Sequence, residues 1–189
     1  MTDRANTITS LDRIVGAVLV VLAVTAQMLW MGLATVVLGV GMLMAYLLWV
    51  GGRWNNDPTA VLPAYLLAIA VQCLHFTEEF VTGFQRRFPR LIGAEWSDAR
   101  FLAFNLVWLA IFVLAALGVH RRARLAYLAV LFLALAGGVA NGAGHLLLSA
   151  VLGGYFPGAA TAPLCLLLGV VLLARLFRKA RTRQATAFE

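Results

Sequence analysis

The sequence has few charged residues and only two cysteines, and both scarcities exclude classes of protein. Charged side chains make up 12% of the 189 residues, about half of the share that is usual in soluble domains. Cys73 and Cys165 lie in separate apolar runs and lack the partner spacing of a zinc finger or a disulfide framework. We therefore exclude a soluble globular fold, a disulfide-stabilised scaffold and a zinc-finger module.

Long apolar runs stand where a soluble protein would carry charge. Hydrophobic residues make up 62% of the chain, and the mean hydropathy is +0.90. Because a helix that crosses a bilayer needs roughly 20 apolar residues, the sequence predicts an all-α fold, a polytopic transmembrane helical bundle with about six spans. We expect one transmembrane domain over residues 14–177, between a cytoplasmic N-terminal segment at 1–13 and a basic cytoplasmic tail at 178–189.

Polar residues and turn formers mark the predicted helix ends. As a single helix, residues 14–50 would be about 55 Å long, nearly twice the thickness of the hydrocarbon core, so we expect the run to fold back within residues 30–35. Asp57 followed by Pro58 has the pattern of a helix N-terminus, and so does Ser97. The remaining predicted helices cover about residues 58–84, 100–119, 125–152 and 160–177.

The distribution of basic residues predicts the orientation of the bundle. The net charge is +7, with 15 Lys and Arg residues. Arg86, Arg87, Arg90 and Arg100 fall on one predicted face, and all the others fall on the face that carries both termini. Since cytoplasmic loops hold the excess of Lys and Arg, we expect both termini in the cytoplasm. Topology accounts for the positive charge, so we expect the lipid bilayer and no nucleic acid as a partner.

Four ionisable side chains interrupt the apolar runs. His75, Glu78 and Glu79 lie in the predicted third helix, and His145 lies in the fifth. A charge near the middle of a span costs about 2.5–3.5 kcal/mol on insertion scales, so such groups usually face the bundle interior and mark a function. Residues three and four apart share a helix face, which predicts two polar stripes. These are Gln72, His75, Glu78, Glu79 and Thr82 on one helix, and Gly138, Asn141, His145 and Ser149 on the other.

The depths of these residues predict that they meet. In a six-span bundle the third and fifth helices run in the same direction, which places His75 about 13 Å and His145 about 10 Å from the same end. Asn105 lies about 8 Å inside that end of the fourth helix. We expect the two imidazole rings and a glutamate carboxylate to converge within about 8 Å. Gly138 and Gly142 form a small-xxx-small pattern that allows a neighbouring helix to approach closely.

The residues of both stripes also carry a family resemblance. The motif is His75-Phe76-Thr77-Glu78-Glu79, or His-x-x-Glu-Glu, and a second block follows as Asn141-x-x-x-His145 and Tyr155-Phe156-Pro157-Gly158. With these blocks the chain resembles the HXXEE family of bacterial membrane proteins over about residues 60–175. The resemblance implies a multi-pass protein of the bacterial inner membrane and marks these positions, but it implies no particular reaction.

A metal site is the first chemistry that fits this constellation. His75, Glu78, Glu79 and His145 could hold one divalent ion, Zn²⁺ or Fe²⁺, and leave a coordination position open for water or substrate. A ferritin-like centre with two metal ions uses four glutamates and two histidines, and the apolar runs contain only two acids. The residue count therefore favours a single ion.

Acid–base chemistry without a metal is the second chemistry that fits these residues. Two adjacent glutamates in a medium of low dielectric constant should not both ionise, so one is expected to hold a proton at neutral pH and to pair with a histidine. Such a pair could protonate an alkene or move a double bond in a lipid or isoprenoid. The predicted catalytic residues are His75, Glu78, Glu79, Asn141 and His145, the predicted substrate-binding residues are Gln72, Asn105 and Tyr155, and the predicted pocket walls are Phe76, Phe80, Phe101, Phe104 and Trp108.

Two alternatives to an enzyme are open. Buried Glu and His residues also form proton or ion pathways in transporters, although the sequence has no evident inverted repeat. The same residues could instead form a polar cluster that only stabilises helix packing, but an interhelical polar contact contributes just about 0.6 kcal/mol on average. We therefore predict an enzyme with a lipid-like or isoprenoid-like substrate.

Overall fold

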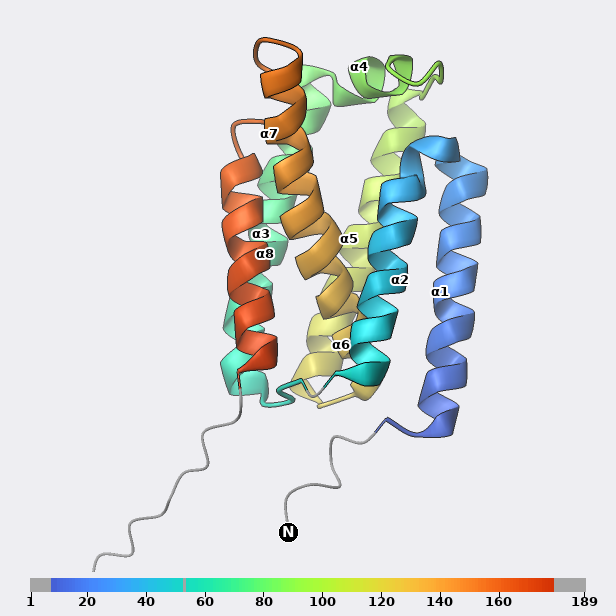
Figure 1. The fold of residues 1–189 in the computed structure, drawn as a ribbon, viewed down its shortest axis with the longest axis vertical. Helices are drawn as coiled ribbons and strands as arrows, with labels where there is room; N and C mark the ends of the chain where they lie inside the picture. Colours follow the sequence, from blue (N-terminus) through green and yellow to red (C-terminus); the bar gives the residue numbers. More distant parts are fainter. Residues whose placement is uncertain (1–7, 53, 179–189) are drawn as a thin grey trace, which may run out of the picture.

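In the computed structural model, residues 8–52 and 54–178 are described, and this part of the chain is built of helices without a strand (Figure 1). The first hairpin consists of α1 (Ser10–Met31), the short 3-10 turn η2 (Gly32–Thr35) and α2 (Val36–Gly51). Next come α3 (Pro58–Thr82), the short α4 (Phe84–Arg90) and α5 (Asp98–His120). One continuous helical stretch follows, formed by α6 (Arg124–Phe132), the π-helix η3 (Leu133–Ala140) and α7 (Asn141–Val151), and then α8 (Ala162–Phe177).

Local sequence sets the helix ends as expected. Asp57 caps α3 by accepting a hydrogen bond from the Thr59 amide, with Pro58 as the first helical residue. The hydroxyl of Ser97 caps α5 in the same way. Gly83 ends α3 with a φ of 84°, a left-handed conformation that favours glycine. The predicted N-termini are therefore confirmed, and η2 makes the predicted reversal within residues 30–35.

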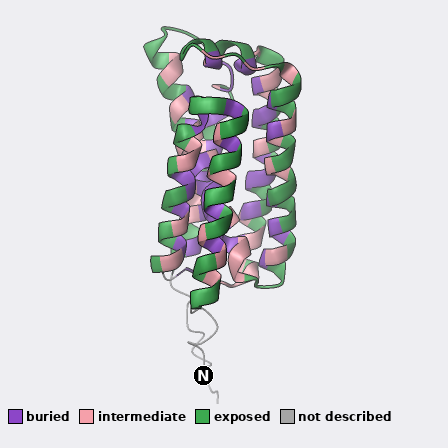
Figure 2. Cartoon of the chain, turned by 90° about the vertical axis from the view of Figure 1, so that its right-hand side faces the viewer, coloured by how far each residue is buried: buried purple, intermediate pink, exposed green. Residues whose placement is uncertain are grey.

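The outer surface of the bundle is apolar. Four stretches are long and apolar enough to cross a membrane, and α8 is apolar but shorter. The four stretches are Ser10–Gly51, Pro58–Thr82, Asp98–His120 and Arg124–Val151. The first of them is bent into a hairpin at η2. Large hydrophobic side chains such as Leu29, Leu33 and Val81 point outward, while the buried residues lie along the inner faces (Figure 2). These are the features of a helical membrane protein; six crossings and the orientation stay predictions.

Both described ends of the chain lie at one end of the bundle. The start of α1 and the end of α8 are together at the end opposite α4 (Figure 1). Arg121, Arg122 and Arg124 lie in and next to the α5–α6 loop at that same end. Most of the predicted cytoplasmic segments, residues 1–7 and 179–189, and also Arg53, are outside the described residues.

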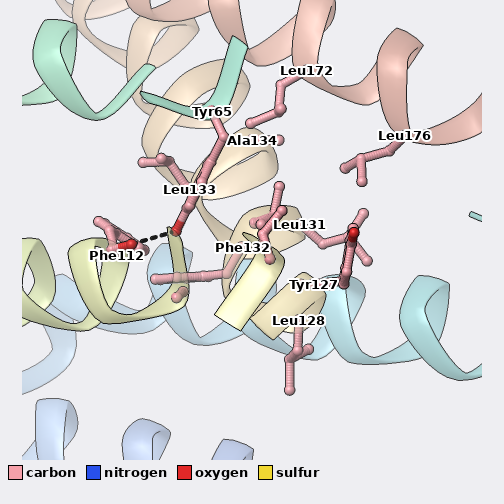
Figure 3. Close-up of a cluster of buried hydrophobic side chains, with 14 of the residues drawn as sticks. Tyr65, Phe112, Tyr127, Leu128, Leu131, Phe132, Leu133, Ala134, Leu172 and Leu176 are labelled. Carbon is pink, nitrogen blue, oxygen red and sulfur yellow. Dashed lines mark hydrogen bonds between the residues drawn. The ribbon is translucent and has the colours of Figure 1, made fainter. Parts of the chain in front are cut away.

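Two features of the packing position the site. Toward the end that carries the termini, Tyr65 and the buried side chains of α6, η3 and α8 form an apolar core, in which the Tyr65 hydroxyl donates to the Phe112 carbonyl at 3.0 Å (Figure 3). Closer to α4, Gly138 and Gly142 face α8. A Cβ on Gly138 would lie 2.6 Å from the Gly169 Cα, and a Cβ on Gly142 would lie 2.6 Å from the Ala162 carbonyl oxygen. The predicted close approach is therefore present, and α8 is the neighbour.

Candidate functional site

Three buried side chains from two helices form the centre of the site. His75 and Glu79 lie one turn apart on α3, and His145 lies on α7. Oε1 of Glu79 is 3.0 Å from Nε2 of His145 and 3.5 Å from Nε2 of His75, and the two rings meet edge to face at a centroid distance of 4.7 Å. All three residues are at most 5% exposed. The convergence expected from the helix depths is confirmed.

The helix that carries His145 has an unusual approach to the site. The π-helix η3 directly precedes α7, and Asn141 is the first residue after it. A π turn holds more residues than an α turn, so it changes the direction in which the following side chains point, and such turns are frequent at functional sites. Asn141 reaches His75, with 2.8 Å between Nδ2 and the histidine Nε2.

Glu78, although adjacent to Glu79, bonds to a different part of the chain. Its partners lie in the connection between α7 and α8, residues 155–161, which we call the strap. The carboxylate accepts hydrogen bonds from the Tyr155 hydroxyl at 2.6 Å, from the amides of Ala160 and Thr161 at 2.9 and 2.8 Å, and from the Thr161 hydroxyl. These four donors occupy both oxygens of Glu78. Among the described residues, the group that could hold a metal ion is His75, Glu79 and His145, without Glu78.

The strap in turn contacts both histidines. The Thr161 Oγ1 is 2.7 Å from Nδ1 of His75, and the Pro157 carbonyl oxygen is 2.6 Å from Nδ1 of His145. Gly158, at a φ of 92°, lies directly against the rings, since a Cβ there would come within 2.5 Å of His145 and 3.0 Å of His75. The strap therefore holds both imidazoles from the side opposite Glu79.

These contacts assign the protons on the histidines. A carbonyl oxygen only accepts, so Nδ1 of His145 carries a hydrogen that is donated to Pro157. The single hydroxyl hydrogen of Thr161 is donated to Glu78, so Nδ1 of His75 must donate to Thr161. In the neutral form of each ring, the lone pair is therefore on Nε2, the nitrogen that faces Glu79. At 3.0 Å, Nε2 of His145 and the Glu79 carboxylate are two acceptors, and an added proton or a metal ion is needed between them.

The residues fit a single divalent ion. Two imidazole nitrogens and one carboxylate oxygen form a donor set that suits Zn²⁺ and Fe²⁺. A tetrahedral ion with bonds of 2.0–2.1 Å separates its ligand atoms by roughly 3.3 Å, close to the 3.0 and 3.5 Å measured from Glu79. Metal-ligating histidines typically donate their other ring hydrogen to a carboxylate, a backbone carbonyl or water. Here His145 donates to the Pro157 carbonyl, and His75 donates to the Thr161 hydroxyl, which itself donates to the Glu78 carboxylate. The Asn141 amide would have to move off Nε2 of His75 to admit the ion.

A cavity of about 210 Å³ adjoins the centre. Glu79, His145 and Asn141 reach it, and so do Gln72 and Asn105, which we predicted to bind substrate. Eight of the 23 lining residues are aromatic: the predicted Phe101, Phe104 and Trp108, together with Phe84, Phe88, Trp96, Phe112 and Phe132.

Other predicted site residues lie outside this cavity. Phe76 and Phe80 pack in the same hydrophobic cluster as Phe101 and Phe104 but are not among the lining residues of the cavity. Tyr155, the third predicted substrate-binding residue, is 52% exposed and bonds to Glu78 instead of reaching the cavity.

Sequence reasoning missed the strap as a support for the histidines. The sequence indicates residues 155–158 as a family block and Tyr155 as a substrate-binding residue, but it does not single out Thr161. Thr161 is 86 positions from its partner His75, and the Pro157 contact is made by a backbone carbonyl, which has no residue signature. The proline-glycine pair in an otherwise apolar region was the one available signal.

A comparison with known proteins places the chain in a family. Residues 66–173, more than half of the chain, match the family described as a protein of unknown function with HXXEE motif. No curated protein and no solved structure matches the chain. The matched range contains the centre, the strap and most of the cavity wall. The chain therefore belongs to the HXXEE family, and His75, Glu78 and Glu79 are the histidine and the two glutamates of its motif.

Proposed function

We propose that this protein is an integral membrane enzyme that binds one divalent metal ion, Zn²⁺ or Fe²⁺, through His75, Glu79 and His145, and that it acts on a lipid-like or isoprenoid-like substrate in the adjoining cavity. One observation carries the proposal: the Nε2 atoms of both histidines lie 3.0 and 3.5 Å from one carboxylate oxygen, and the strap contacts the Nδ1 atom of each ring. When bound, such an ion supplies Lewis-acid activation of a water molecule or of a substrate oxygen.

The other residues of the site have roles that this chemistry requires. Glu79 and His145 both reach the cavity, so the open side of the centre faces the space where a substrate would lie. Asn141 can hydrogen-bond an oxygen at that side once its amide leaves His75. The aromatic wall excludes water and strengthens electrostatic interactions within the site. A cluster that only stabilised packing would not need an adjoining cavity.

Metal analysis of the purified protein tests this proposal. We expect about one zinc or iron per chain in the wild type after loading, and loss of the ion in Glu79→Gln and His145→Ala. Glu95→Gln and His120→Ala are matched controls at exposed positions and should keep the ion. Lipid extracts of cells that carry the wild type or Glu79→Gln should differ in one membrane-soluble compound. Unchanged metal content in both site variants would contradict the proposed metal centre. Identical lipid extracts would contradict the proposed enzymatic activity.

Acid–base catalysis without a metal is the second candidate, and one distance favours it. The 3.0 Å between Nε2 of His145 and the Glu79 carboxylate is also that of a direct hydrogen bond when the ring carries a second proton. This candidate predicts that the lipid difference between wild type and Glu79→Gln persists in protein that binds no metal. Metal analysis and lipid extraction together therefore distinguish the two chemistries.

A further inference from the structure

The cavity has two chemically different walls. Most of its aromatic lining residues belong to α4 and α5, whereas η3 and α7 contribute small residues. The small residues are Ala136, Gly137, Ala140 and Gly144. A Cβ on Gly144 would meet no atom within 4 Å, so this glycine opens directly into free space. The side-chain sizes on the two walls therefore leave a space beside the metal-binding group, and its surface is mostly apolar.

The cavity lining has few polar groups, and among the described residues it includes no arginine or lysine. Its ionisable residues there are Glu79 and His145, and its neutral polar residues are Thr35, Gln72, Asn105 and Asn141. None of the four arginines at this end, Arg86, Arg87, Arg90 and Arg100, is among the lining residues. Arg86 pairs with Asp98 at 2.7 Å, and Arg87 lies over the Phe156 ring and donates to the Tyr155 carbonyl. A phosphate or diphosphate group in this space would have no arginine or lysine in the lining to pair with it. A divalent ion at the centre would not balance such a group, because the Glu79 carboxylate already offsets one of the ion's two positive charges. Burying the remaining negative charge without a partner is costly.

The cavity also belongs to the part of the chain that is suited to a bilayer. Its walls come mainly from α2, α3, α5 and the α6–α7 stretch, all within segments apolar enough to cross a membrane. The Trp96 indole donates to the Met31 carbonyl at 3.0 Å and ties the start of α5 to the end of α1 beside the cavity. A ligand here is in reach of the bilayer.

We infer that the ligand of this cavity is a neutral, bilayer-soluble molecule with an apolar body and a single small oxygen-bearing head, such as a long-chain alcohol, aldehyde or ester, and not a phosphorylated lipid. The head lies at Glu79, His145 and Asn141, and the body lies between the aromatic wall and Gly144. This inference rests on the proposed function for the placement of the head, and it names the substrate class of that same site.

Tryptophan quenching tests the inference, because Trp96 and Trp108 line the cavity. The probe is ω-bromodecanol, added to the full-length protein in nanodiscs, since bromine quenches tryptophan on contact. We expect a saturable quenching component that plain decanol displaces and that Trp108→Phe reduces. The matched anionic probe, ω-bromodecyl phosphate, should bind at least about tenfold more weakly, because its dianionic head has no arginine or lysine in the lining and exceeds the net charge of the centre even when an ion is bound. Equal or tighter binding of the phosphate would overturn the neutral-head assignment.

Substitutions that fill the cavity show whether the probe binds there. Gly144→Leu should weaken saturable quenching by about tenfold or more, and Ala140→Leu should act in the same direction. Gly51→Leu, at a glycine whose Cβ also meets nothing within 4 Å but which lies at the far end of α2, should bind the probe like the wild type. Unchanged binding in both cavity variants would place the ligand elsewhere and overturn the inference.

Metal content measured on the same samples separates this inference from the proposed function. Wild type that binds metal but shows no saturable quenching contradicts the ligand assignment alone. Wild type that binds the alcohol but no metal leaves the ligand assignment standing and contradicts the metal centre. Retained metal in Gly144→Leu shows that this variant is folded, so that its loss of quenching is attributable to the filled cavity.

Discussion

The two adjacent glutamates of the motif have different partners because successive residues of an α-helix point about 100° apart. Glu79 points inward to His75 and His145, whereas Glu78 points to the strap, where it accepts four hydrogen bonds. Through Thr161, Glu78 fixes the ring hydrogen of His75 without touching the ring itself. Glu79 is therefore part of the centre, and Glu78 positions the centre through the strap.

Removing the Thr161 hydroxyl should weaken the centre more than it weakens the fold. In Thr161→Val the ring hydrogen of His75 loses its acceptor, so we expect about 10–100-fold weaker zinc binding, the range found when partners of metal-ligating histidines are removed. The lost hydrogen bond should also reduce the free energy of unfolding by about 1–3 kcal/mol. Zinc competition titrations and thermal unfolding measure the two effects.

Two variants control for this loss. Thr161→Ser keeps the hydroxyl and should restore zinc binding. Thr77→Val removes a hydroxyl from α3, the helix of His75. This hydroxyl donates to the Cys73 carbonyl and not to the site, so the variant should bind zinc like the wild type. Zinc affinity in Thr161→Val equal to that of Thr161→Ser would contradict the positioning role.

At the scale of elements, the strap is as important to the site as the helices. α3 and α7 bring the three central residues together, but the orientation of both rings depends on residues 155–161. The strap is held at Tyr155, Ala160 and Thr161 by Glu78, and the Phe156 amide donates to the hydroxyl of Ser149 on α7. A change of conformation in the strap should therefore act on both histidines at once.

Gly158→Ala should disrupt the centre. The added methyl group would come within 2.5 Å of His145, at a φ of 92° that alanine rarely adopts. Steric overlap and backbone strain each cost about 1–3 kcal/mol, and displacement of the rings should abolish metal binding. Gly153→Ala is the matched control, since Gly153 also has a positive φ of 71° but its Cβ would meet nothing within 4 Å. We expect Gly153→Ala to be destabilised by strain alone and to keep its metal; loss of metal in both variants would mean that the ring contact is not the cause.

At the scale of the whole molecule, the bundle is divided along its length. The end that carries the described chain ends is packed with apolar side chains around Tyr65 and Tyr127, as Figure 3 shows. The half nearer α4 holds the His/Glu group, the strap and the cavity. Packing against α8 at Gly138 and Gly142 connects the two halves. Stability can therefore come mainly from one half, while the other half keeps an open space.

Cysteine labelling of intact cells tests the predicted orientation. Gly154→Cys, next to the strap, should react with a membrane-impermeant maleimide from outside. Ala123→Cys, in the basic α5–α6 loop, should react only after permeabilisation, because basic loops stay in the cytoplasm. The wild type, with Cys73 and Cys165, gives the background. Labelling of Ala123→Cys alone in intact cells would invert the topology and place the site in the cytoplasmic half.

Much of the architecture follows from the sequence alone. The helices and their ends could be predicted from local features. These are an apolar run too long for one span, which predicts the reversal within residues 30–35, and the caps at Asp57 and Ser97. Helical periodicity and depth also placed His75 and His145 together, because in a bundle of parallel spans the position along a helix fixes the depth in the membrane. Local chemistry and length therefore determined which elements form and which residues could meet.

Only the tertiary structure decided how the site is built. The sequence left Glu78 and Glu79 equivalent, and their separation depends on which face of α3 meets α7 and which meets the strap. The roles of Thr161 and of the Pro157 carbonyl arise from contacts between segments far apart in the chain. The cavity brings together small residues of η3 and α7 and aromatic residues of α5, which are far apart in the sequence. Side-chain packing across helices decides such features, and it has no counterpart in the periodicity of any one helix.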